Sequence, residues 1–318
     1  MDRLRIVAAW ALALVLLAPS TGSTDPIFTF AVWLNGEPTA GFPGQAPNPI
    51  PYTLDNAFGV GAATLVSTKD LEAPGFLNGF DAVVISRFGA TDGLGGLPQL
   101  TLAAVTQIQA YVGKGQNQGG VAVFTNDAAD SLFLPPGIPR TDPYDPNLDR
   151  LFTNSAAGAA STHHGYVGEL NGAIMAFSKN DLEPDLPAIG LLPGSSTGPT
   201  EVAQKDPNHP VPFIYQVGPI GTGHPIDAGI TFPFKTSEVT LFLGYVTGFD
   251  SGNVVDQYGD NGLDALAGVP AIVANPAAIG GVVPPPQVPA PPSLVLLGLG
   301  LTGLAAWTRG RRNRSRDN

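Results

Sequence analysis

The heptapeptide FDAVVIS, residues 80–86, decides the fold class of this chain. Its central residues are apolar in succession, which predicts a strand buried on both faces, as strands of parallel sheets are. Residues 100–112 follow with apolar side chains at helical spacing, and Gly113 marks the end of the predicted helix. A second apolar run, GGVAVF at 119–124, predicts another strand. Strand, helix and strand in this order predict an α/β fold with a parallel sheet between helices.

Further elements can be placed on both sides of this unit. Residues 27–34 and 63–67 predict strands, and residues 54–60 predict one or two helical turns. Residues 134–160 and 178–212 are rich in Pro, Asp and Gly, which predicts a loop-rich second half. Short periodic pieces lie at 148–152, 166–170, 173–177, 213–217 and 239–245, and the last of these predicts a strand. The predicted core consists of Val83, Val84, Ile85, Leu102, Val105, Ile108, Val121 and Val123.

The composition excludes several classes of protein. Because the 318 residues include no cysteine, the chain cannot hold a disulfide framework, a cysteine-ligated zinc, an iron–sulfur cluster or a cysteine nucleophile. Hydrophobic residues make up 43% and charged residues 13%, so the chain can bury a sizeable core. The formal net charge is −11, and basic residues concentrate at the ends, which leaves 8 basic against 24 acidic residues between them. Such an acidic body should repel nucleic acid, so no nucleic-acid partner is expected.

The N-terminal segment, residues 1–22, has the pattern of a secretory signal peptide. A basic start, MDRLR, precedes an uncharged apolar run at 6–17, and small residues follow at Ala18, Ser20 and Gly22. The run is too short to span a bilayer, and the small residues suit a signal peptidase. The alternative is a buried N-terminal helix. Export predicts that the body, residues 23–281, works outside the cytoplasm.

The C-terminal segment has the order of a membrane anchor. A Pro-rich linker at 282–292 leads into an apolar segment at 293–308, and five arginines crowd the tail at 309–318. The pattern predicts a single membrane helix whose basic tail stays cytoplasmic while the body lies outside. At about 1.5 Å per residue, the uncharged residues 294–307 within this segment reach roughly 21 Å, against about 30 Å of hydrocarbon. The arginines must therefore snorkel, or the bilayer must thin.

The C-terminal pattern also resembles the PEP-CTERM sorting signal of Gram-negative exosortase substrates. The residues that carry the resemblance are Val288, Pro289, Ala290, Pro291, Gly298, Gly300, Arg309, Arg311 and Arg312. Ala290 stands where the family usually has Glu, which leaves the sortase variant open. The resemblance implies an exosortase as processing partner and a destination at the cell surface or in the exopolysaccharide matrix. The alternative is an ordinary C-terminal tail anchor.

The body resembles, more distantly, the flavodoxin-like core of class I glutamine amidotransferase-like domains. The strand–helix–strand unit at 80–124 and the turn GHPIDAGI at 223–230 carry this resemblance. It implies a three-layer parallel sheet. Catalytic members of that group place a cysteine nucleophile after the strand, where this chain has Thr125, Asn126 and Asp127. The resemblance therefore implies a non-catalytic body.

Candidate chemistry is confined to a few polar residues. The four histidines, at 163, 164, 209 and 224, do not have the spacing of a zinc site and are expected in turns or at the surface. No Gly-x-Ser-x-Gly elbow marks a serine nucleophile. Two stretches, 142–149 and 250–264, are dense in the oxygen ligands that Ca²⁺ prefers, although neither has the EF-hand spacing. The predicted calcium ligands are Asp250, Asn253, Asp256, Asp260 and Asp264. The alternative is that these residues form turns and helix caps.

The sequence thus predicts an exported protein of a Gram-negative bacterium. It would be held briefly at the inner membrane, sorted to the cell surface or the extracellular matrix, and carry a non-catalytic binding or structural body with possible exopolysaccharide contacts. The alternative is a secreted hydrolase of polysaccharide or peptide whose carboxylate pair cannot be chosen from the acidic residues. Hydrolysis of a polysaccharide needs two carboxylates about 5–9 Å apart in an open cleft.

Overall fold

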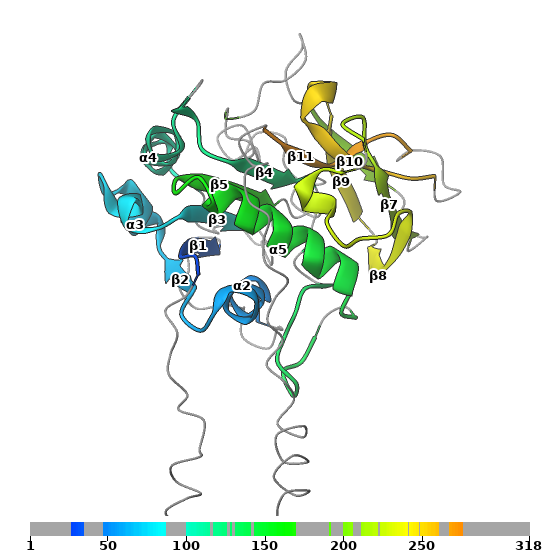
Figure 1. Cartoon of the computed structure of the whole chain (residues 1–318), viewed down its shortest axis with the longest axis horizontal. Helices are drawn as coiled ribbons and strands as arrows, with labels where there is room; N and C mark the ends of the chain where they lie inside the picture. The colour runs from blue at the N-terminus through cyan, green and yellow to red at the C-terminus, as the bar shows by residue number, and fades with distance from the viewer. Residues whose placement is uncertain are drawn as a thin grey trace, which may run out of the picture. The chain divides into compact units, whose positions relative to one another are not determined.

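The computed structural model of the chain shows an α/β fold (Figure 1). It describes residues 27–34, 47–86, 100–114, 117–125, 128, 131–140, 143–169, 191, 200–205, 211–221, 223–240, 242–247, 249–260 and 267–275. The chain divides into two units, Met1–Val282 and Val283–Asn318, and every described residue belongs to the first. Within the described part, no helix is both long and apolar enough to cross a bilayer. The predicted signal peptide, linker, membrane segment and basic tail lie outside the described residues.

A parallel half forms one side of a nine-stranded sheet. Its strands, in sheet order, are β2 (Ala63–Val66), β1 (Phe30–Leu34), β3 (Ala82–Ser86), β5 (Gly165–Glu169) and β4 (Val121–Phe124). All neighbours among these five pair in parallel. Strands β1, β3, β4 and β5 are buried along their whole length. In β1, β3 and β4 this burial accompanies nearly unbroken apolar runs. The strand order differs from the flavodoxin-like one, because β5 inserts between β3 and β4.

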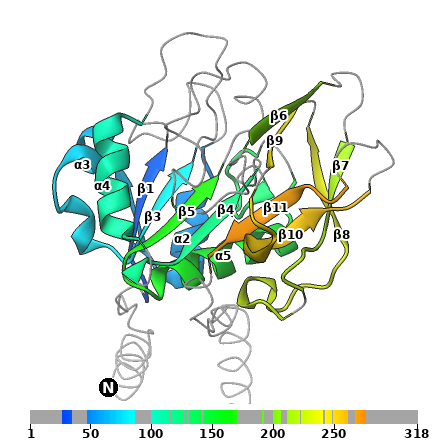
Figure 2. The same ribbon diagram turned by 90° about the horizontal axis from the view of Figure 1, so that it is seen from above.

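An antiparallel half completes the sheet, which corrects the predicted all-parallel sheet. Its strands continue from β4 in the order β11 (Pro270–Ala274), β10 (Val254–Tyr258), β7 (Val211–Val217) and β8 (Phe234–Thr240), as Figure 2 shows. Each of these neighbours pairs antiparallel. A separate antiparallel pair consists of β6 (Thr200–Lys205) and β9 (Phe242–Thr247). The single strand predicted at 239–245 is therefore two strands, β8 and β9, in two different sheets.

Helices cover both faces of the parallel half. Helices α3 (Thr68–Glu72) and α4 (Leu102–Val112), with the 3₁₀ turn η1 (Phe76–Gly79), pack on one face through a shared core with β1, β3 and β4. Helices α2 (Ile50–Phe58) and α5 (Pro146–Ala160) pack on the other face (Figure 1). Because side chains alternate along a strand, Val83 and Ile85 meet the α4 layer, whereas Val84 meets the α5 layer. The predicted three-layer arrangement thus holds for the parallel half.

Seven of the eight predicted core residues are buried, and Leu102 is not. Leu102 is 76% exposed because the buried stripe of α4 runs through Ala104, Val105, Ile108 and Val112. Leu102 lies at the first turn, beside that stripe. Its core position is taken by Leu100, which precedes the N-cap Thr101 and is buried. Gly113 ends the helix as predicted, with a left-handed φ of 77°.

Helix α5 is the largest element that the sequence pattern missed. Its start is well specified, since Asp145 accepts hydrogen bonds from the amides of Asn147 and Leu148, and Pro146 occupies the first turn. Its last turn is built of small residues and packs directly on the starts of β4 and β5. Glycines at 120 and 165 allow this approach, because a Cβ at either position would collide with the backbone of Ala159.

We therefore expect Gly165→Ala to destabilise the fold. The new methyl group would collide with the Ala159 carbonyl, and neither backbone can move without shifting α5 from the sheet. Overpacking of this kind costs about 1–3 kcal/mol. Urea denaturation measures the loss. Gly79→Ala is the matched control, because nothing lies within 4 Å of a Cβ there. Equal stabilities of the two variants would contradict the proposed close packing.

Candidate functional site

The carboxyl ends of the parallel strands meet at one edge of the sheet, and two of them end in polar residues. Ser86 is the last residue of β3, and Glu169 is the last residue of β5. The two strands are neighbours, and these two residues are register partners. Their side chains therefore lie side by side on one face of the sheet. In open α/β sheets the crevice outside the carboxyl ends is where ligands bind.

A buried hydrogen-bond network joins these residues. The Ser86 hydroxyl donates to Glu169 Oε2 at 2.6 Å, and the Ala128 amide donates to Glu169 Oε1 at 2.8 Å. Asn48, which precedes α2, donates from Nδ2 to Ser86 Oγ at 3.3 Å and accepts from the Ile50 amide at 2.9 Å. Ser86, Glu169 and Asn48 are each at most 2% exposed. Both oxygens of the Glu169 carboxyl group thus have a donor inside the protein.

The chain topology places this network near a switch in strand order. Strand β1 lies between β2 and β3. The connection from β1 to β2 therefore leads to one side of β1, and the connection from β2 to β3 crosses to its other side. Such a switch point opens a crevice at the carboxyl ends. The connections that follow β1 and β3, residues 35–46 and 87–99, lie outside the described residues. We therefore identify the Asn48–Ser86–Glu169 network as the floor of the candidate site.

Thr125 occupies the position at which the amidotransferase-like resemblance expects a nucleophile. It is fully buried, and its hydroxyl donates to the Pro270 carbonyl of β11 at 2.5 Å. The Thr125 hydroxyl thus donates a hydrogen bond from the end of β4 to β11. Asn126 and Asp127 lie outside the described residues.

The histidines lie away from this network. His163 and His164 are in the turn between α5 and β5, at the opposite edge of the sheet, and not on a strand. His163 Nδ1 is 2.7 Å from Asp81 Oδ1 at the surface, and His164 Nε2 is 3.2 Å from the Asn117 carbonyl oxygen. His224 is in a turn as predicted but is buried, and burial lowers its pKa. His209 lies outside the described residues.

The predicted calcium segment is not one loop. Residues 251–253 form a 3₁₀ turn, and Asp256 lies inside strand β10. Asp250 and Asp260 are exposed, whereas Asn253 is 7% exposed and Asp256 is fully buried. The described residues contain no group of three acidic or histidine side chains able to hold a metal ion, so we assign no metal ligand among them. Asp264 lies outside the described residues, and calcium binding by the whole set stays a prediction.

The other acidic stretch, residues 142–149, has a structural role where it is described. Asp145 is the N-cap of α5, as the capping alternative predicts for such residues. Asp149 Oδ1 accepts from the Phe133 amide at 3.0 Å and from the Thr53 hydroxyl at 3.1 Å. Burial raises the pKa of Asp149, although these hydrogen bonds oppose the shift. These hydrogen bonds thus join the described residues at 131–140 and 143–145 to α2 and α5.

A buried carboxyl pair is the feature of the site region that the sequence did not reveal. Asp256 on β10 faces Asp227, the last residue of the 3₁₀ turn η5 (Pro225–Asp227). Asp256 is fully buried and Asp227 is 8% exposed. None of their four carboxyl oxygens has a hydrogen-bond partner among the described residues, the other carboxyl group included. The two residues are far apart in sequence and meet only because η5 folds over the antiparallel half.

Both carboxyl groups have a raised pKa, so each keeps its proton to a higher pH than an exposed carboxyl group does. Burial raises the pKa of Asp256 to about 9, and the negative charge of Asp227 adds to the shift. Burial also raises the pKa of Asp227 to about 7. The pair titrates as a unit.

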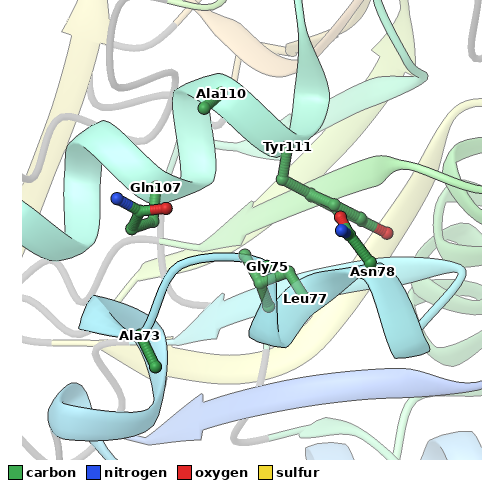
Figure 3. Close-up of a pocket in the computed structure, with 7 residues that line it drawn as sticks. All are labelled: Ala73, Gly75, Leu77, Asn78, Gln107, Ala110 and Tyr111. Carbon is green, nitrogen blue, oxygen red and sulfur yellow. The ribbon is translucent and has the colours of Figure 1, made fainter.

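A small pocket lies between α4 and the α3–η1 segment (Figure 3). Its volume is about 150 Å³, and its lining residues are Ala73, Gly75, Leu77, Asn78, Gln107, Ala110 and Tyr111. The Tyr111 hydroxyl donates to the Phe80 carbonyl at 2.8 Å, and burial raises the pKa of this phenol far above its usual range. The lining offers two amides and no carboxylate or imidazole. The pocket can therefore form hydrogen bonds but has no acid–base group of ordinary pKa.

No family model, curated protein or solved structure significantly matches this chain.

Proposed function

We propose that this chain is an exported protein of the cell surface or exopolysaccharide matrix, sorted by an exosortase and carrying a non-catalytic binding or structural body. Signal peptidase would remove residues 1–22, and the membrane segment at 293–308 would hold the body at the inner membrane until the exosortase acts.

The observation that carries this proposal is the order of the C-terminal segments: Pro-rich linker, short glycine-containing apolar segment and arginine-rich end. Strand β11 is the last described element, and Asn275 closes it by bonding to Gly119 and Val121. The Pro-rich linker begins a few residues later. Release of the segment that follows would remove none of the described strands.

The chemistry of the body supports a binding or structural role. At the carboxyl edge, Glu169 accepts two internal donors, and the Thr125 hydroxyl is committed to β11. A general base needs a lone pair that can reach the substrate. Glu169 instead stabilises the floor on which the 87–99 connection begins.

The rival function, a hydrolase with a carboxylate pair, is not favoured by the pair that the structure describes. Asp227 and Asp256 are buried, whereas polysaccharide hydrolysis needs two carboxyl groups about 5–9 Å apart in an open cleft. Both are at least nine-tenths buried. A substrate therefore cannot reach this pair in the described structure.

The expected result of export is a processed surface form. In a Gram-negative host with an active exosortase, the mature protein should lack the residues after about Pro292, as intact-mass analysis would show. Replacing Leu296, Leu297 and Leu299 by Asp should abolish processing and release the body from membrane fractions. Each charge near the middle of the apolar segment costs about 2.5 kcal/mol or more.

The matched control is Leu102→Asp, which puts the same change at a leucine that is 76% exposed on the body. It should leave membrane association and processing unchanged. A surface form that keeps Arg309 to Asn318 would contradict sorting. A membrane form that is identical in hosts with and without the exosortase would identify an ordinary tail anchor instead.

A further inference from the structure

We propose that the pocket between α4 and the α3–η1 segment binds one neutral sugar unit of a polysaccharide. The side-chain amides of Asn78 and Gln107 hold its hydroxyl groups, and the apolar surface between them holds its C–H groups. The inference names a ligand for the body. It therefore rests on the binding role proposed above, and not on the sorting of the chain.

One wall of the pocket is a face of α4. Gln107, Ala110 and Tyr111 line it together, because residues three and four positions apart are neighbours on the surface of a helix. Figure 3 shows the Gln107 side chain towards one end of the pocket and the Asn78 side chain towards the other. A ligand that lies along α4 can therefore reach both amides.

The opposite wall is the chain that joins α3 to η1, residues 73–78. Gly75 has a left-handed φ of 76°, which lets the chain turn back after Ala73. The backbone amide of Asn78 then donates to the Gly75 carbonyl at 3.1 Å. Leu77 is 3% exposed and belongs both to the core and to the lining. This wall thus presents an amide beside an apolar surface that the core supports.

Hydrogen bonds join the two walls near both ends of α4. At its start, the hydroxyl of the N-cap Thr101 donates to Glu72 Oε1 at 2.7 Å. In its last turn, the Tyr111 hydroxyl donates to the Phe80 carbonyl at 2.8 Å. The pocket between these two bonds is therefore formed before a ligand arrives. A preformed site spends less of its interaction energy on ordering its own groups.

The lining is neutral and can both donate and accept hydrogen bonds. None of its residues carries a charged side chain, and the Tyr111 phenol stays protonated because burial raises its pKa. Among the described residues, none forms a hydrogen bond with the side-chain amide of Asn78 or Gln107. A sugar hydroxyl also donates and accepts, so it can pair with either end of such an amide. A charged ligand would find no counter-charge in the lining.

The size of the pocket suits a single sugar unit. Its volume is about 150 Å³. A water molecule occupies about 30 Å³ in the liquid, whereas sites for drug-sized ligands measure about 300–1,000 Å³. One sugar ring falls between these limits. Its C–H groups can pack on Ala73, Leu77 and Ala110 while its hydroxyl groups meet the amides.

The test is nuclear magnetic resonance of the full-length chain in micelles of a detergent that contains no sugar. The probes are the methyl glycosides of glucose, galactose, mannose and N-acetylglucosamine. At least one of them should shift the side-chain NH₂ signals of Asn78 and Gln107 saturably at millimolar concentration. Gln107→Ala should weaken this binding about three- to tenfold, the effect of one lost hydrogen bond. Ala110→Leu should abolish it, because the larger side chain fills the pocket.

The matched control is Gln109→Ala, which removes another amide from α4, outside the lining, and should bind as wild type does. The proposal is overturned if none of the four glycosides shifts the two amide signals below molar concentration, a result that needs no variant to fold. It also fails if Gln107→Ala and Ala110→Leu bind like wild type, because the sugar then binds elsewhere. Tighter binding of glucosamine or glucuronic acid would contradict a neutral ligand. Sorting is measured separately, by the mass of the surface form, so the two proposals fail by different results.

Discussion

Replacing Val84 by Asp should unfold the body at neutral pH. Val84 is fully buried at the centre of β3, between register partners Val32 on β1 and Val167 on β5. Its side chain lies on the face covered by α2 and α5. Loss of the apolar side chain costs about 1.5–3 kcal/mol, and an unpaired buried carboxylate costs several more. The total is comparable with the 5–15 kcal/mol that stabilises a typical domain.

The matched control is Val60→Asp, because Val60 is 84% exposed in the turn between α2 and β2. Circular dichroism and urea denaturation should show a folded protein of nearly wild-type stability for this control. They should show an unfolded or molten chain for Val84→Asp. A cooperative transition of near wild-type midpoint in Val84→Asp would mean that β3 is not the buried central strand of the parallel half.

This central part of the fold could be predicted because its strands have unbroken apolar runs. Burial on both faces demands such a run, and AVVI in β3 and VAV in β4 supply it. The spacing of Val105, Ile108 and Val112 likewise specified the buried side of α4. Leu102 shows the limit of the method, since a leucine at the first helical turn satisfies the spacing rule without facing the sheet.

The missed elements have weaker local signals. Helix α5 ends in Ala and Gly, whose small side chains carry little apolar signal, yet these are the residues that fit against the sheet. Its cap, Asp145-Pro146, was detectable but lay in a stretch that also suits calcium. The antiparallel half depends on pairing between distant segments, as between β4 and β11. Local periodicity does not encode such pairing.

The same reasoning explains what was missed at the candidate site. Glu169 ends a short strand and has no motif around it, and its partners Ser86 and Ala128 come from other strand ends. Only the strand order brings the three together. The pairing of Asp227 with Asp256 needs both the antiparallel register of β10 and the docking of η5 on α5. The sequence contained the aspartates but no information on which of them would meet.

Replacing Glu169 by Leu should remove the floor of the candidate site and strongly destabilise the fold. The change deletes the acceptors of the Ala128 amide and the Ser86 hydroxyl, which lie in the protein interior. A buried donor deprived of its acceptor costs about 1–3 kcal/mol, so two together cost about 2–6 kcal/mol. Glu169→Gln should cost less, because its carbonyl can still accept from the Ala128 amide and its NH₂ group can donate to Ser86 Oγ.

The control for this prediction is Glu72→Leu. Glu72 Oε1 also accepts a hydroxyl hydrogen bond, from Thr101 at 2.7 Å, but the bond is exposed, so water can replace the lost acceptor. Urea denaturation should therefore rank the free energies of unfolding as wild type and Glu72→Leu highest, Glu169→Gln lower and Glu169→Leu lowest. If Glu169→Leu were as stable as Glu72→Leu, the network would not be a buried structural floor. Glu169 would then be free to serve a ligand, and the non-catalytic role of this edge would have to be abandoned.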